Sequence, residues 1–81
     1  MTRDQLNIGL AAVLTTLAEA GSAPAGHLYA AMMPRYTLDD FNDVMGVLKR
    51  AELVTEERHL VTITDAGRAL ASKIEEARSS K

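Results

Sequence analysis

The feature that most constrains this chain is a change in its hydrophobic period near residue 52. Before this position, apolar side chains recur every three or four residues, as they do on one face of an α-helix. Beyond it, residues 53–56 and 60–63 form two short runs rich in β-branched side chains, which are typical of strands. A helical pattern returns after residue 64. The sequence therefore predicts helices, then one hairpin, then a closing helix.

The first two helices are predicted from their end signals. A helix over residues 3–20 begins after Thr2, a good capping residue, and ends at Gly21, which can adopt a left-handed conformation. Residues 22–24 are predicted to form a turn. A second helix then opens at Pro24, since proline is tolerated in the first helical turn, and runs to about residue 32.

The third helix has the clearest start signal. Thr37 is the predicted cap, Asp40 takes the capping-box position, and Tyr36 and Phe41 have the spacing of a hydrophobic staple. Because the usual acid in this box is Glu or Gln, the reciprocal bond from Asp40 is left open. The helix is predicted to run to about residue 51, with a buried stripe formed by Phe41, Val44, Met45 and Leu48.

The hairpin and the last helix complete the pattern. The hairpin tip at residues 57–59 must be short and lacks glycine, so its turn type is left open. Thr64 and Asp65 are predicted to cap the closing helix. The buried face of that helix is predicted from apolar spacing and consists of Ala66, Leu70, Ile74 and Ala77. At the end of the second helix, Met32 and Met33 are predicted to fill the core.

Length and composition bound the function. The 81 residues suit a single domain, predicted over 1–81 with an ordered core at about 3–77 and a frayed tail at 78–81. The absence of cysteine excludes disulfides and thiolate metal sites. No apolar stretch approaches the roughly 18 residues of a membrane span, and the start lacks a signal-peptide pattern. We therefore expect a cytoplasmic protein that does not enter a membrane.

The side chains that could carry catalysis are few and dispersed. His27 and His59 fall on different predicted elements with no metal-ligand spacing between them. Asp39, Asp40 and Asp43 lack the alternating ligands and glycine turn of a calcium loop, and an acidic helix start explains them more simply. We therefore expect no enzyme, no metal, no cofactor and no evident small-molecule substrate.

Two stretches carry a resemblance to a known superfamily. One is Leu48-Lys49-Arg50-Ala51-Glu52-Leu53-Val54, which leads from a helix into a strand, and the other is Leu60-Val61-Thr62-Ile63-Thr64-Asp65-Ala66-Gly67-Arg68. Over about residues 5–77 the chain resembles the winged helix-turn-helix superfamily, in the manner of the small bacterial and phage MarR and PadR regulators. The second wing strand of these regulators commonly ends in Leu-Thr-x-x-Gly-Arg, which residues 63–68 resemble. In the first stretch the chain departs from the pattern, because Glu52 stands where the regulators usually have glycine. The resemblance implies a mainly α fold with a small β-hairpin: three helices, a two-stranded wing and a C-terminal helix.

The resemblance also implies a transcription regulator, or an accessory of one, that binds double-stranded DNA. The third helix would then lie in the major groove, where Asn42 could pair with adenine. Basic residues in the preceding turn, at the helix end and on the wing tip would contact phosphates. The predicted DNA-binding set is Arg35, Asn42, Lys49, Arg50, Arg58 and His59.

Charge and a second apolar face keep an alternative open. The net charge is −2, and DNA binders usually carry a basic surplus. A winged helix can instead be an adaptor that binds another protein and no DNA. We also expect a homodimer, because a domain this small gains from burying more surface and the first helix has further apolar residues. The predicted dimer contacts are Ile8, Ala11 and Ala12, with Ala18 on the same expected face.

Overall fold

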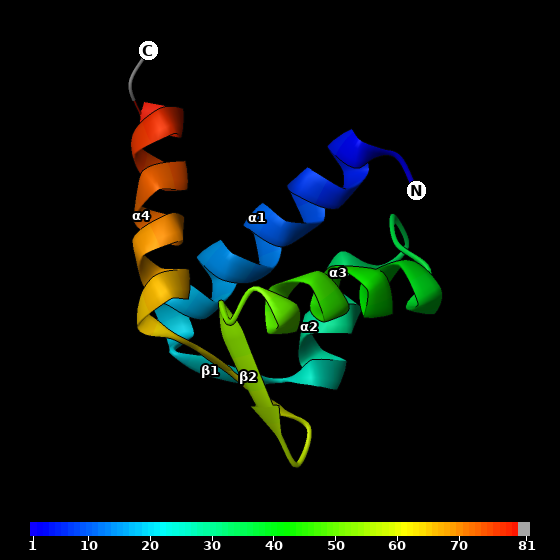
Figure 1. The fold of residues 1–81 in the computed structure, drawn as a ribbon. Helices are drawn as coiled ribbons and strands as arrows, with labels where there is room; N and C mark the ends of the chain where they lie inside the picture. The colour runs from blue at the N-terminus through cyan, green and yellow to red at the C-terminus, as the bar shows by residue number, and fades with distance from the viewer. Residues whose placement is uncertain (80–81) are drawn as a thin grey trace.

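The computed structural model describes residues 1–79 and is mainly helical, with a small antiparallel sheet. Three helices precede the hairpin and one follows it, and α4 and the hairpin extend in opposite directions from the region where they meet (Figure 1). Of the tail predicted to be frayed, residues 80–81 lie outside the described residues. The elements are α1 (Arg3–Ala20), β1 (Ser22–Pro24), α2 (Ala25–Met32), α3 (Leu38–Arg50), β2 (Val54–Glu57), β3 (Leu60–Ile63) and α4 (Asp65–Ser79).

The caps predicted for α1 and α3 are confirmed. Thr2 Oγ1 accepts a hydrogen bond from the Gln5 backbone N–H at 3.1 Å, and the Gln5 side chain returns a bond to the Thr2 N–H at 3.0 Å. The box at Thr37 and Asp40 is also present, but its reciprocal bond is longer, at 3.5 Å. Aspartate is one methylene shorter than glutamine, so its carboxylate reaches less far back to the cap.

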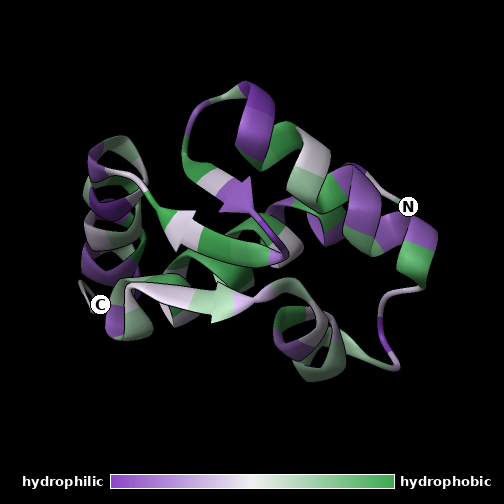
Figure 2. Ribbon diagram, turned by 90° about the horizontal axis from the view of Figure 1, so that it is seen from below, coloured by the Kyte–Doolittle hydropathy of each residue, from purple (hydrophilic) through white to green (hydrophobic). Residues whose placement is uncertain are grey.

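The sheet has three strands, so the predicted turn at residues 22–24 is wrong. These residues form β1, which pairs antiparallel with β3, and β3 lies between β1 and β2 (Figure 2). Gly21, with φ of 81°, directs the chain alongside β3, and its carbonyl accepts a bond from the Ile63 N–H at 3.1 Å. A three-residue edge strand that contains proline leaves no periodic signal in the sequence. Pro24 occupies the position before α2 without a side-chain capping bond, and the helix begins at Ala25, one residue later than predicted.

The predicted buried face of α4 is wrong by one position. Gly67 and Ala71 are buried and Ile74 is half-buried, whereas Ala66, Leu70 and Ala77 are exposed. A side chain at position 67 would overlap the carbonyl oxygen of Leu53, so only glycine allows this close approach. The contact with the segment before β2 therefore sets the rotation of α4, and apolar spacing does not.

The core lies where α1, α2, α3 and the sheet meet. The predicted stripe of α3 is confirmed, because its four apolar residues are buried. Met32 is buried as predicted, but the prediction for Met33 is wrong, since its side chain is 51% exposed. Tyr36 is buried next to α1, and its hydroxyl donates to the Gln5 carbonyl at 2.6 Å. The largest fully buried side chains are Leu14, Leu17, Leu28, Leu48, Val13, Val44, Val54 and Val61.

Candidate nucleic-acid interface

The outward side of α3 is the first part of the candidate site. Burial of the apolar stripe turns the polar residues of the helix toward solvent, and those predicted to face DNA are exposed. Carboxylates occupy the N-terminal half of this surface and cations the C-terminal end. This arrangement suits the helix dipole, which favours negative charge at the start of a helix and positive charge at its end. The exposed residues are Asp39, Asn42, Asp43, Lys49 and Arg50.

Lys49 is held by the neighbouring strand. Its Nζ lies 2.8 Å from Oε1 of Glu56 on β2, and this is the closer of the two ion pairs found within residues 1–79. The carboxylate neutralises much of the positive charge that Lys49 would offer to a phosphate. Arg50, one residue further on, is exposed and makes no ion pair with the described residues.

The end of α3 is stabilised by a left-handed residue that is not glycine. Glu52 has φ of 59°, the Leu53 N–H bonds to the Leu48 carbonyl at 2.9 Å, and the Glu52 N–H bonds to the Lys49 carbonyl at 3.1 Å. These two bonds form a Schellman motif, in which glycine is the usual left-handed residue. The helix therefore ends where the resemblance to the regulator families implies, although Glu52 carries the backbone strain.

The hairpin tip is the second part of the candidate site. Glu57 pairs with Leu60, so Arg58 and His59 form a two-residue loop, one residue shorter than the predicted tip. Both have positive φ, 53° and 67°, as in a type I′ turn, which is usually made by Asn-Gly. Both side chains are exposed, and the tip end of β2 is hydrophilic (Figure 2).

The strained tip is held from outside the hairpin. The His59 carbonyl accepts a hydrogen bond of 2.7 Å from the N–H of Ala25, the first residue of α2. This N–H belongs to the group at a helix start that has no partner within the helix. β1 also pairs with β3 up to Leu60, directly beside the loop. The position of Arg58 and His59 is therefore fixed by contacts that do not involve their side chains.

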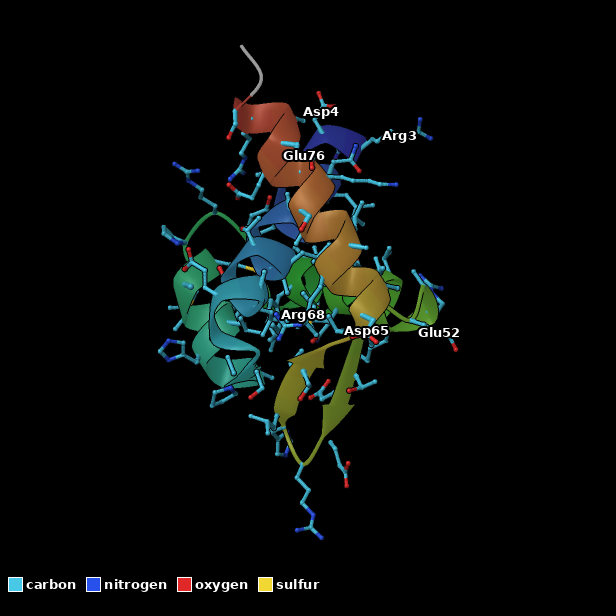
Figure 3. The ribbon with its side chains drawn as sticks, turned by 90° about the vertical axis from the view of Figure 1, so that its left-hand side faces the viewer. Arg3, Asp4, Glu52, Asp65, Arg68 and Glu76 are labelled. Atoms are coloured by element: carbon cyan, nitrogen blue, oxygen red, sulfur yellow. The ribbon has the colours of Figure 1, made fainter. Side chains whose placement is uncertain are left out.

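The residues of the Thr-Asp-Ala-Gly-Arg stretch have structural roles. Thr64 Oγ1 donates to the Glu52 carbonyl at 2.7 Å and accepts from the Gly67 N–H at 3.1 Å. Arg68 lies beside the end of α1, where it donates to the Ala18 carbonyl at 3.4 Å (Figure 3). Thr64, Gly67 and Arg68 thus connect α3, the hairpin, α1 and α4. Asp65 and Ala66 of the same stretch are exposed.

The remaining predicted site residues come together only in part. Arg35 lines a hollow between α1 and α2 together with Ile8 and Ala12. Ala11 is half-buried and does not line this hollow, and Ala18 borders a separate hollow towards α4. The structure therefore places Arg35 with two of the predicted dimer contacts, and nothing in the sequence pattern indicated that association.

His27 is exposed at the start of α2. Residues 1–79 contain no group of three or more His, Asp or Glu side chains placed to hold a metal ion. Within the same residues, the helices are too short or too polar to cross a membrane. No protein family, curated protein or solved structure that was compared matches this chain.

Proposed function

We propose that this chain is a winged helix-turn-helix domain that binds double-stranded DNA, as a cytoplasmic transcription regulator or an accessory of one, and that it has no catalytic site of its own. In this proposal, α2 and α3 are the helix-turn-helix, β2 and β3 are the wing, and α3 enters the major groove. Asn42 on the outward side of α3 faces the base edges. Its side-chain amide can form two hydrogen bonds with one adenine, accepting from the N6 amino group and donating to N7.

The observation that carries the proposal is the hairpin tip. Two residues with full side chains occupy left-handed positions, where each loses about 1–2 kcal/mol relative to glycine. Packing does not explain this choice, because both side chains are exposed. Strained backbone persists mainly where function requires the side chain it carries. Arg58, with His59 beside it, is suited to contact a phosphate near the groove that α3 occupies.

The positive charges contribute unequally in this proposal. Arg50 and Arg58 have no carboxylate partner within residues 1–79, so we assign them the main phosphate contacts. Lys49 contributes less while Glu56 holds it. Arg35 lies at the other end of α3, in the turn before the helix, and its contribution to DNA binding is the smallest of the four. Few phosphate contacts imply modest affinity and a shallow salt dependence.

The adaptor alternative is favoured by one specific observation. Asp39 and Asp43 are exposed on the half of α3 that would lie nearest the bases, and Lys49 at the other end of the helix is paired with Glu56. A basic protein surface would be attracted to a face that repels phosphate. In this alternative the same face of α3 binds a basic partner and the domain does not bind DNA.

The test is a salt titration with a generic DNA duplex. Each phosphate contact adds a slope of about −0.9 to log affinity against log salt, so Arg50→Ala with Arg58→Ala should flatten the slope by roughly two units. The matched control is Lys73→Ala with Arg78→Ala on α4, which removes the same charge from exposed positions and should leave the slope unchanged. Absence of duplex binding by the unaltered protein at low salt would refute the DNA proposal.

The tip has its own test. Replacing Arg58 by Asn and His59 by Gly supplies the residues that a type I′ turn prefers. The fold should become more stable while duplex affinity falls, because the strain is relieved and Arg58 is lost. Equal or tighter duplex binding by this variant would show that the tip conformation does not serve DNA contact.

A further inference from the structure

A hollow between α1 and α2 has no occupant within the described chain. It has a volume of about 210 Å³ and continues into a second hollow of about 80 Å³, because both are lined by Ala12, Ala31 and Met32. The lining is apolar except for Thr16 in the smaller hollow and Arg35 and Tyr36 in the larger one. Arg35 is the only charged side chain that lines either hollow among residues 1–79.

The edges of this hollow carry two of the most exposed large hydrophobic side chains. Ile8 is 59% exposed and Met33 is 51% exposed, and both line the larger hollow. One face therefore combines a projecting side chain, Ile8, with a recess floored by Ala12 and Ala31. A contact about a twofold axis requires that one surface contain both a projection and a recess that accepts it.

We propose that a second copy of this chain occupies the hollow, with the two α1 helices antiparallel and Ile8 of each copy over the partner subunit's Ala12. The two residues lie four positions apart on one face of α1, so a twofold axis between them forms both contacts at once. The face buries apolar surface that a domain of this size cannot bury alone.

Charge supports a second copy over an unrelated helix. Residues 20–38 contain no Asp or Glu, so neither α2 nor the turn after it offers Arg35 a carboxylate. Arg35 makes no ion pair within residues 1–79. Glu19 is exposed near the other end of α1, where it borders the separate hollow towards α4. Helical periodicity places it on nearly the same side of α1 as Ile8 and Ala12. An antiparallel arrangement brings the partner subunit's Glu19 toward Arg35. The twofold axis repeats this charge pair, so the dimer contains it twice.

The contact leaves the candidate nucleic-acid interface free. The outward side of α3 and the hairpin tip contribute no residue to either hollow. The dimer does not depend on DNA binding. It engages Arg35 alone among the predicted DNA-binding residues, and Arg35 is the one to which the proposed function gives the smallest contribution. Loss of duplex binding in other variants would therefore leave the dimer intact.

The test is a pair of charge reversals followed by light scattering over a concentration series. Arg35→Glu alone and Glu19→Arg alone each place like charges together at both ends, so each should weaken the dimer at least about tenfold. An equimolar mixture of the two variants should regain the dimer, because both pairs are then opposite in sign. Lys73→Glu on α4 is the matched charge control and should dimerise as the unaltered protein does.

The apolar half of the contact is tested separately. Ile8→Glu should weaken the dimer, whereas Leu70→Glu, at an exposed position of α4, should not. Circular dichroism will confirm that each variant is folded, which is expected since all these positions are exposed. The proposal is overturned if the unaltered protein has the mass of one chain at every concentration. It is also overturned if the mixed variants stay monomeric, or if Leu70→Glu disrupts the dimer and Ile8→Glu does not.

Discussion

Two regions of this molecule contrast in how closely the structure specifies their residues. The first, here called the junction, comprises Leu48, residues 51–53 and residues 63–68, where the end of α3 meets the hairpin base and α4. The second, the outer surface, comprises the exposed side of α3 and the hairpin tip. In the junction, Thr64 bonds across to Glu52 and Gly67 lies against Leu53. On the outer surface, no packing explains why Asn42 or Arg58 stands where it does.

The difference shows which part of the sequence carries information about function. The junction contains the residues on which the likeness to regulators depends, and their contacts are needed for the fold whatever the domain binds. The outer surface is under no such constraint, so its residues are available for recognition. Exceptions to local preference have different meanings in the two regions: Glu52 ends a helix, whereas Arg58 and His59 present side chains to solvent.

The largest difference is expected between the two sides of α3. Leu48 is fully buried, so Leu48→Ala should lower the free energy of unfolding by about 2–5 kcal/mol through lost burial and an incompletely filled cavity. Leu38→Ala, at an exposed position of the same helix, is the control and should change stability by less than about 0.5 kcal/mol. Urea unfolding measures both, and equal effects would contradict the assigned rotation of α3.

The glycines of the two regions should respond with opposite signs. Gly67→Ala places a methyl group against the Leu53 carbonyl and 2.7 Å from Ile63 Cγ1, so it should destabilise the fold by about 1–3 kcal/mol. Gly46→Ala, within α3, meets nothing within 4 Å and should stabilise it by up to about 1 kcal/mol. Thermal and urea unfolding would reveal the sign, and stabilisation by Gly67→Ala would mean that α4 does not approach Leu53, the residue before β2, so closely.

The left-handed residue of the junction should gain from glycine. Glu52→Gly should raise the free energy of unfolding by about 1 kcal/mol, because φ of 59° is strained for a side chain and easy for glycine. Glu57→Gly, which removes the same charge from strand β2, should instead lower it, since glycine is unfavourable in a strand. If both substitutions destabilised equally, the Schellman motif at the end of α3 would be misassigned.

The smallest stability effect, with a visible effect on binding, is expected at the ion pair on the outer surface. The Lys49 side chain is 46% exposed, so Glu56→Gln should change stability by less than about 1 kcal/mol. It also frees Lys49, and under the proposed function the salt slope of duplex binding should steepen by about 0.9. Glu76→Gln on α4 makes the same change in net charge without freeing a cation near α3. An equal slope change in both variants would mean that only net charge matters.

Local rules were sufficient for most of the helices and strands. The limits of α1, the capping box at Thr37 and the strand at residues 60–63 all followed from signals within a few residues of one another. Apolar spacing also identified the buried face of α3, because that helix has one strongly amphipathic pattern. Such features depend on the backbone and its nearest neighbours, so they can be derived from sequence.

The candidate site was only partly accessible in this way. Exposure of Asn42, Arg50 and Arg58 followed from the helical and hairpin patterns. The pairing of Lys49 with Glu56 and the grouping of Arg35 with Ile8 did not, because each joins residues on different elements. Their association depends on how the elements pack, which no spacing along one element encodes.

What the sequence by itself determined is therefore the order of the helices and the hairpin, the caps of α1 and α3, and the core face of α3. Only the tertiary structure decided that residues 22–24 form a strand, since three residues acquire that conformation by pairing with β3. It likewise decided the rotation of α4, where one close approach at Gly67 outweighs the apolar pattern of Ala66 and Leu70. A backbone clash acts over a few tenths of an ångström and allows no compromise. The cost on the other side is limited, because Ala66 is small and Leu70 is only 37% exposed.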